Sequence, residues 1–171
     1  MAKIIKCTLS TLDDAIREIE AYERELSGKV KRLREAVAER IGEHAGAMFD
    51  GAVVDDMLNG TRYAEVSVSI DSQENITLVI ANGEDAVFVE FGAGVYHNGS
   101  PGSSPHPEGA RLGFTIGSYG DGHGKRKVWG YREDGDGPLI LTHGAPASMP
   151  MYNAMKNVLD QVAEIAKEVF G

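Results

Sequence analysis

The sequence predicts an α+β fold in which a long N-terminal helix and a C-terminal helix pack on a small antiparallel β-sheet, with a long glycine-rich loop before the C-terminal helix. Three patterns predict it: apolar residues at helical spacing over residues 12–41, alternation with a period of two over residues 66–80, and a second helical stripe over residues 151–169. Steps of three and four are typical of an amphipathic helix, and a period of two is typical of a half-buried strand. A chain of 171 residues can bury roughly 70% of its unfolded surface, so we expect a single domain over residues 1–171.

Residues 1–51 are expected to be mainly helical. Ser10 or Thr11 can cap the start of the helix, its end lies near Asp50, and Gly28 is an interior position that costs about 1 kcal/mol relative to alanine and can mark a bend. Ile4 and its neighbour Ile5 are compatible with a short preceding strand. The apolar stripe consists of Leu12, Ile16, Ile19, Leu26, Val30, Leu33, Val37 and Ile41.

Residues 62–92 are expected to form a β-hairpin followed by a short helix or strand. Val66, Val68 and Ile70 alternate with polar residues, and after a turn at residues 72–75 the apolar residues Ile76, Leu78 and Ile80 continue the period of two. We therefore expect a hairpin with one apolar face that contains both sets. Periodicity does not assign residues 84–91, but the acidic start at residues 84–85 and the glycine at position 92 favour a short helix.

Residues 93–137 are expected to form a glycine-rich loop region, with two short strands near residues 113–119 and 128–132. A loop of this length inside a compact domain is usually functional or ordered by a partner. Residues 138–171 are expected to form a last short strand at 139–142 and the C-terminal helix, with Pro150 at its first position. The stripe of that helix consists of Met151, Met155, Val158, Leu159, Val162, Ile165 and Val169.

Composition narrows the classes of function. The net charge is −9, which repels nucleic-acid phosphates and argues against a sequence-reading DNA binder. Trp129 and Tyr131 follow basic residues at 125–127 and have the chemistry to stack on bases, but with this net charge we favour aromatic side chains that pin a loop to the sheet. Cys7 is the only cysteine, so no intramolecular disulfide forms. No stretch approaches the ~18 apolar residues of a membrane span, and no signal peptide is evident, so we expect a soluble protein made in the cytoplasm.

Several residues resemble parts of an active site. Four histidines lie in the second half of the chain and have the chemistry to converge on a metal with Glu90 and Asp121, but the helical spacings that place two ligands on one face are absent. Neither a strained serine turn nor a phosphate-binding loop of the required spacing is present. We therefore expect no catalytic, metal-binding or cofactor-binding residues. The four histidines are His97, His106, His123 and His143.

Four motifs follow one another along the chain. They are Phe-Val-Glu-Phe-Gly-Ala-Gly at residues 88–94, Gly-Ser-Tyr-Gly-Asp-Gly-His-Gly at 117–124, Trp-Gly-Tyr at 129–131 and Thr-His-Gly-Ala-Pro-Ala-Ser-Met-Pro-Met-Tyr-Asn-Ala at 142–154. Their order resembles the neck or tail-completion proteins of long-tailed bacteriophages. In that family an aromatic-Glu-Phe-Gly motif precedes a variable loop, and a Gly-x-Pro-x-x-Pro-Met segment leads into the C-terminal helix. The long N-terminal helix is also similar in kind.

The resemblance implies a non-enzymatic structural protein of a phage or prophage. It implies a homo-oligomeric, hexameric ring at the head–tail junction, where DNA passes through without sequence-specific binding. Its partners would be other head–tail connector proteins and tail-tube or tail-terminator proteins, and it would occupy the host cytoplasm during assembly and then the neck or tail of the virion. Candidate interface residues are Phe88, Glu90, Phe91, Gly92, Gly94, Tyr119, Trp129, Tyr131, His143, Pro146, Pro150 and Met151.

Within this interpretation, residues 87–94 and 144–151 support the two roots of the glycine-rich loop, and residues 99–126 reach toward a neighbouring subunit. Two other functions stay open at this point. One is a small cytoplasmic metal-dependent hydrolase that uses His97, His123, His143 and nearby acids. The other is a generic bacterial interaction protein.

Overall fold

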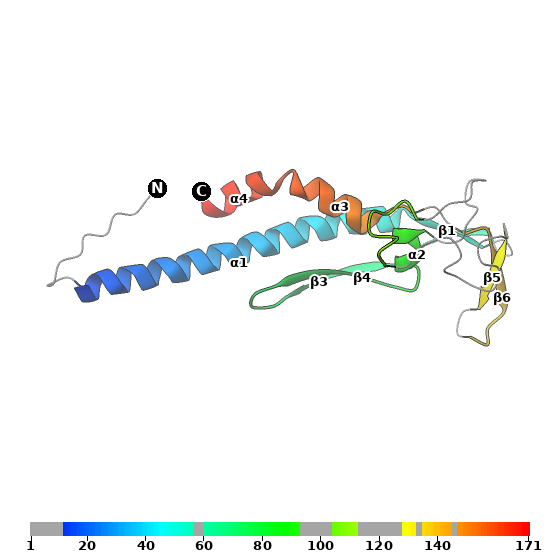
Figure 1. Cartoon of the computed structure of the whole chain (residues 1–171), viewed down its shortest axis with the longest axis horizontal. Coiled ribbons are helices and arrows are strands. Elements are labelled where there is room, and N and C mark those ends of the chain that lie inside the picture. The colour runs from blue at the N-terminus through cyan, green and yellow to red at the C-terminus, as the bar shows by residue number, and fades with distance from the viewer. Residues whose placement is uncertain (1–11, 57–59, 93–103, 113–127, 133–134, 145–146) are drawn as a thin grey trace.

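The protein has an elongated α+β architecture, seen in a computed structural model that describes residues 12–56, 60–92, 104–112, 128–132, 135–144 and 147–171. A long helix, α1 (Leu12–Asp50), runs through most of its length, with the C-terminal helices on one side and a β-hairpin on the other (Figure 1). The predicted α+β class is confirmed. The strands of the described residues, however, lie in three separate two-stranded antiparallel sheets.

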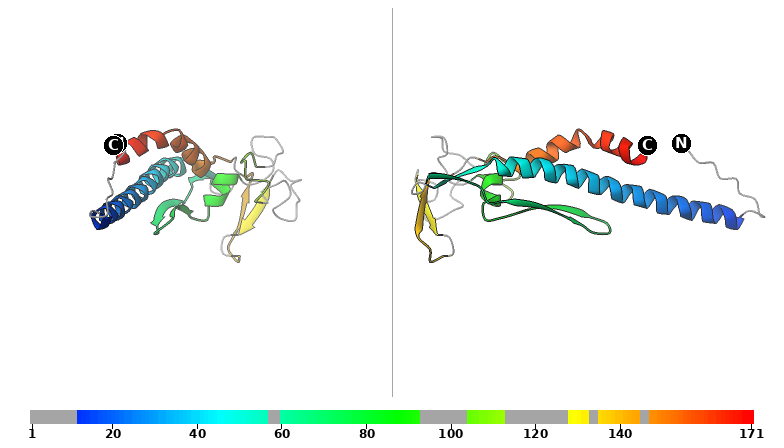
Figure 2. Two further views of the ribbon diagram at one scale, coloured as in Figure 1. Left: turned by 60° about the vertical axis from the view of Figure 1, so that its left-hand side comes forward. Right: turned by 180° about the vertical axis from the view of Figure 1, so that it is seen from behind.

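Helix α1 has 39 residues, and its predicted range is confirmed. It continues through Gly28 without interruption, while the predicted caps at Ser10 and Thr11 and the possible strand at Ile4 lie outside the described residues. The side chain of Lys29 lies 6.0 Å from the ring of Phe170, and Arg34 donates a 2.8 Å hydrogen bond to the carbonyl of Glu74 in the hairpin turn. The start of α1 projects past the end of α4 (Val162–Phe170) and past the turn of the β3–β4 hairpin (residues 67–82) (Figures 1 and 2).

The first hairpin was not predicted. Strands β1 (Val53–Asp56) and β2 (Gly60–Tyr63) pair antiparallel directly after α1. The segment is short and rich in polar residues, so it shows no run with period two. A hydrogen bond from the Ala64 N–H to the Ala52 carbonyl, 2.9 Å long, continues the pairing and sets the direction in which the chain leaves α1.

The second hairpin is confirmed, but its predicted apolar face is wrong. Strands β3 (Ser67–Ser72) and β4 (Thr77–Asn82) are antiparallel, and Val68 pairs with Ala81. Four residues separate the paired Ser72 and Thr77, so even-numbered residues of β3 share a face with odd-numbered residues of β4. Leu78 and Ile80 therefore lie on the outer face of the hairpin. The inner face packs on α1, where a Cβ at Gly42 would lie 3.3 Å from Cδ1 of Ile70.

The structure also contains three short elements that the sequence led us to expect: α2 (Ala86–Phe91), β5 (Trp129–Arg132) and β6 (Leu139–Thr142). Helix rather than strand at residues 84–91 is confirmed, and Gly92 follows it with φ 82°. The strands expected near 128–132 and at 139–142 are confirmed, and the structure adds that β5 and β6 pair antiparallel. The strand expected near 113–119 lies outside the described residues.

The C-terminal helix is divided in two, which the sequence did not predict. Helix α3 (Pro150–Leu159) ends before Asp160, and α4 (Val162–Phe170) follows. The side-chain amide of Gln161 donates to the Asn157 carbonyl, and its backbone N–H donates to Val158 instead, at 2.9 Å. In a continuous helix the Gln161 N–H would donate to the Asn157 carbonyl, but here the Gln161 side chain uses that acceptor.

The core lies where α1, α2 and α3 meet near the base of the hairpin. Its buried members are Ala45, Phe49, Ala52, Val89 and Ala154. The two alanines at 45 and 154 let α1 and α3 approach closely.

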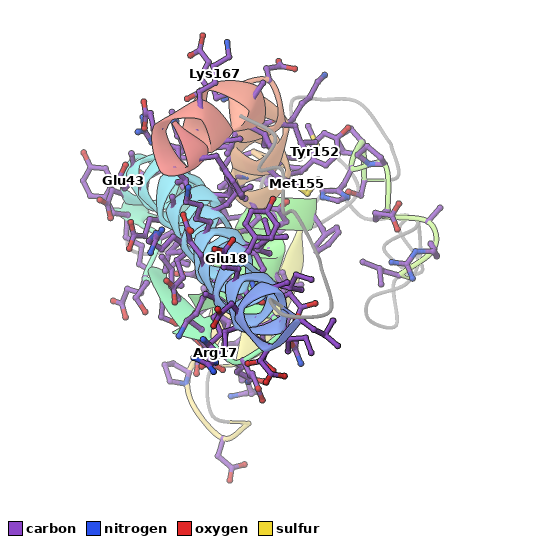
Figure 3. All side chains as sticks on the ribbon, turned by 90° about the vertical axis from the view of Figure 1, so that its left-hand side faces the viewer. Arg17, Glu18, Glu43, Tyr152, Met155 and Lys167 are labelled. Carbon is purple, nitrogen blue, oxygen red and sulfur yellow. The ribbon has the colours of Figure 1, made fainter. Side chains whose placement is uncertain are left out.

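Figure 3 looks along the molecule from the start of α1. Arg17 and Glu18 project from the first turns of α1, and Lys167 lies on the side of α4 that faces away from α1. Among the described helices, none is long and apolar enough to cross a membrane.

Candidate functional site

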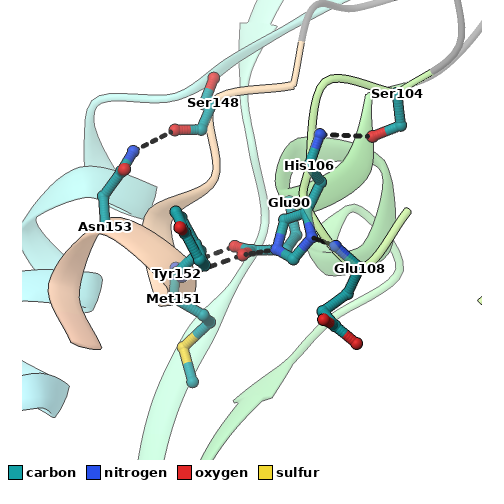
Figure 4. Close-up of polar contacts among 8 residues, drawn as sticks. All are labelled: Glu90, Ser104, His106, Glu108, Ser148, Met151, Tyr152 and Asn153. Atoms are coloured by element: carbon teal, nitrogen blue, oxygen red, sulfur yellow. Dashed lines mark hydrogen bonds and ion pairs between the residues drawn. The ribbon is translucent and has the colours of Figure 1, made fainter. Parts of the chain in front are cut away.

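The most developed polar site surrounds Glu90, at the junction of α2 and α3. Helix α3 starts after Met149, which has φ 53°, and no local side chain caps it. The carboxylate of Glu90 takes this role from α2: Oε2 accepts from the Met151 N–H at 2.8 Å, and Oε1 accepts from the Tyr152 N–H at 3.0 Å (Figure 4). The first backbone N–H groups of a helix lack partners within the helix and carry a partial positive charge, so a carboxylate there is stabilising.

His106 closes the site from the other side. Its Nδ1 accepts a hydrogen bond from the Glu108 N–H at 3.1 Å, which places the ring hydrogen on Nε2, and Nε2 donates to Glu90 Oε1 at 3.1 Å (Figure 4). The ring contacts two aromatic side chains, with centroids 4.4 Å from Phe91 and 5.2 Å from Tyr152. His106 is 8% exposed and Glu90 is 7% exposed. The pair is therefore enclosed and hydrogen-bonded.

This arrangement is suited to holding α2, the start of α3 and the segment around His106 together. Glu90 accepts three hydrogen bonds, and both ring nitrogens of His106 are engaged, so neither side chain is directed at open space. In the described part of the chain, no group of three or more histidine, cysteine, aspartate or glutamate residues is placed to hold a metal ion. For the hydrolase alternative, His97 and His123 lie outside the described residues, and His143 is exposed after β6.

The structure brings a subset of the predicted interface residues together. Glu90, Phe91, Pro150 and Met151 meet at this junction, and Pro150 is buried at the first position of α3. Phe88 lies on α2, and its carbonyl accepts the 2.8 Å hydrogen bond from the Gly92 N–H. Trp129 and Tyr131 pair with Thr142 and Ile140 in the β5–β6 hairpin. Gly94, Tyr119 and Pro146 lie outside the described residues.

A second buried carboxylate was missed from the sequence. Asp85 is 6% exposed and binds the guanidinium of Arg62 in a bidentate manner, at 2.6 and 3.1 Å. It also accepts from the Glu65 N–H at 2.9 Å. Asp85 thus ties the β1–β2 hairpin and the chain before β3 to the start of α2. The sequence indicated only that position 85 is acidic and lies at the start of an expected short helix.

The N-terminal part of α1 carries a third candidate site, which we call the α1 stripe. Its side chains are between 41% and 51% exposed, although they are large and apolar. A row of half-exposed apolar side chains along one helix face is a candidate interaction site. The members of the α1 stripe are Leu12, Ile16, Ile19, Tyr22, Leu26 and Val30.

None of the protein-family models, curated proteins or solved structures compared with this chain matches it.

Proposed function

We propose that the chain is a non-enzymatic structural subunit of the head–tail junction of a long-tailed bacteriophage or prophage, and that it assembles as a hexameric ring. The motif order in residues 88–154 supports the assignment to the neck or tail-completion proteins. The observation that carries the assembly part is the α1 stripe. A helix that extends beyond its own core with a row of half-exposed apolar side chains is stabilised when a neighbouring surface covers them.

The spacing of the α1 stripe fits a helical or sheet partner. Leu12, Ile16, Ile19, Leu26 and Val30 follow steps of three, four and seven, so they form one seam along the helix. A ring requires a heterologous contact, in which two different surfaces of the same chain meet. The outer face of the β3–β4 hairpin exposes Leu78 and Ile80 opposite Asp71 and Ser69, so it is a second, mixed polar and apolar surface on the same chain. In the proposed ring, this face of one copy would meet the α1 stripe of the next.

The charge of the chain is compatible with a DNA conduit. Repetition of a subunit of net charge −9 around a channel gives a wall that repels phosphates, which limits nonspecific retention of translocating DNA. In this function the protein occupies the host cytoplasm during assembly and the virion neck or tail afterwards. Its partners are connector proteins and tail-tube or tail-terminator proteins.

The test is a charge-inserting double variant in the α1 stripe. Ile16→Glu with Ile19→Glu is expected to abolish the ring, seen by native mass spectrometry and electron microscopy, and to leave unjoined heads and tails in phage assembly. The matched control is Arg17→Gln with Arg24→Gln, which changes the net charge equally at positions outside the stripe. Rings that persist in the stripe variant, or heads that still join tails, would show that the proposal is wrong.

A further inference from the structure

The β3–β4 hairpin has two long edges, and no other described strand pairs with either of them. The hairpin lies along α1, on the side away from α3 and α4 (Figure 1). Among the described elements, β4 makes its main contacts with β3 and α1. An unpaired strand edge is a template for pairing with a further strand. Each edge of the hairpin is thus a candidate interaction surface.

The hydrogen bonds of the hairpin decide which backbone groups of β4 are directed outward. The Gln73 N–H donates to the Ile76 carbonyl at 2.8 Å, and hydrogen-bonded and non-hydrogen-bonded residue pairs alternate from this position along the strands. By this alternation, Thr77, Val79 and Ala81 direct their N–H and C=O groups away from β3. These groups form the edge of β4.

The edge of β4 lacks the features that usually protect an exposed strand. Proteins guard such edges with charged side chains, proline, a bulge or a very short strand. β4 has six residues, none of which is charged or proline, and its register with β3 is continuous. β3, by contrast, carries Asp71. The edge of β4 is therefore the one suited to pairing.

β4 is complementary to a second β4 in the antiparallel direction. With Val79 of one copy opposite Val79 of the other, Thr77 lies opposite Ala81, and the outward backbone groups exchange hydrogen bonds. Leu78 then lies opposite Ile80, and these side chains are 38% and 37% exposed in the single chain. Aliphatic pairs across strands stabilise a sheet, and no like charges meet. An uncharged strand has no ion pair with which to select a foreign segment, so this pattern indicates a second copy of the chain.

We propose that two copies of the chain pair through the edge of β4, in a single sheet with the strand order β3-β4-β4-β3. Both copies use the same surface, so the contact is isologous and closes on itself. The proposed ring uses a different, heterologous contact between the outer face of the hairpin and the α1 stripe. The β4 pair therefore does not rest on the proposed function. It covers an edge that would otherwise lead free subunits to aggregate.

The experiment uses the full-length chain with Ile16→Glu and Ile19→Glu, which removes the proposed ring contact, and we call it the ring-deficient chain. Sedimentation equilibrium is expected to show a dimer. Adding Val79→Pro removes an outward N–H at the two-fold axis but no hydrogen bond to β3. It should raise the dimer dissociation constant at least about 30-fold, since two backbone hydrogen bonds are lost. The matched control, Ser72→Pro, changes an outward N–H of β3 in the same way and should leave the constant unchanged.

A cysteine at the two-fold axis tests the register. In a ring-deficient chain that also carries Cys7→Ser, Val79→Cys should form an intermolecular disulfide under mild oxidation. The reason is that opposed Cα atoms of a hydrogen-bonded pair lie about 5.5 Å apart, within the range that a disulfide spans. Ile70→Cys, on the edge of β3, is the matched control and should stay reduced. Equal cross-linking at positions 70 and 79 would overturn the inference.

The oligomeric state separates this inference from the proposed function. A monomeric ring-deficient chain, beside a wild-type chain that forms rings, would contradict the β4 pair alone. A dimer that Val79→Pro leaves intact, in a chain that circular dichroism shows to be folded, would also overturn the pair. If Val79→Pro unfolds the chain, Thr77→Pro changes the neighbouring outward N–H and is read in the same way. A wild-type chain that forms β4 dimers but no rings would contradict the proposed function alone.

Discussion

The carboxylate of Glu90 accepts a 2.8 Å hydrogen bond from the backbone N–H of Met151, 61 positions further along the chain. A side chain of one helix thereby performs the capping of another. Caps are usually supplied by the residue just before the helix. Here that residue is Met149, whose thioether is a weak acceptor and makes no capping bond, so the start of α3 depends on α2.

Glu90→Ala is expected to lower the free energy of unfolding by about 2–4 kcal/mol, because it removes a helix cap and leaves enclosed N–H donors without a partner. Glu90→Gln keeps one acceptor oxygen and should have a smaller effect. Urea denaturation followed by circular dichroism measures both. Glu108→Ala, which removes an exposed carboxylate nearby, should change stability by less than about 0.5 kcal/mol. Equal losses for Glu90→Ala and Glu108→Ala would contradict this role of Glu90.

The Arg62–Asp85 pair is expected to be coupled by about 1–2 kcal/mol in a double-mutant cycle with alanine. The geometry is bidentate and Asp85 is buried, but the Arg62 side chain is 38% exposed, so solvent reduces the interaction below that of a fully enclosed pair. The exposed Glu108–Arg111 pair serves as the reference and should be coupled by less than about 0.5 kcal/mol. Comparable coupling in the two cycles would be inconsistent with the burial of Asp85.

The two faces of the β3–β4 hairpin should respond differently to truncation in the isolated subunit. Val68→Ala is expected to cost about 1–2 kcal/mol, because Val68 packs against the core beside α1. Ile80→Ala removes more atoms but should cost less than about 0.5 kcal/mol, because Ile80 lies on the outer face. Chemical denaturation of the two variants decides between this register and the single apolar face that the sequence suggested. A larger loss for Ile80→Ala would support the latter.

Two glycines should respond in opposite directions to alanine. Gly28→Ala is expected to stabilise α1 by about 1 kcal/mol, since a Cβ there meets nothing within 4 Å and alanine favours helix. Gly83→Ala should be strongly destabilising, because φ is 140° and the added Cβ would lie 2.0 Å from the Glu65 carbonyl oxygen. Thermal unfolding by circular dichroism compares them directly. A fall in stability for Gly28→Ala would mean that the glycine is required where it stands.

The sequence predicted best where one pattern continued for many residues. The range of α1 follows from eight apolar positions at helical spacing, and residues 150–170 follow from seven. The hairpin register was not predictable in the same way. Residues 78–81 are all apolar, so β4 carries apolar side chains on both faces and its period of two does not choose one. The register depended instead on the number of residues in the turn.

The sequence could not reveal the partners of individual residues around Glu90. His106 lies in a region without periodicity, and it was grouped with the other histidines as a metal candidate. Glu90 was singled out by its motif, but nothing local indicates that it accepts hydrogen bonds from residues 151 and 152. One usable signal existed: α3 begins with Pro150 and has no serine, threonine, asparagine or aspartate at its cap position, which implies a distant acceptor.

The long-range cap of α3 also affects the order in which the elements form during folding. Proline at its first position favours helical geometry there, but its first turn gains its acceptor only after residues 86–91 have formed α2 and docked. Closure of a contact over 61 positions is slower than local helix formation. During refolding, α1 and the β3–β4 hairpin should therefore become protected from hydrogen exchange before the first turn of α3. The time at which that turn becomes protected then reports when α2 docks on the start of α3.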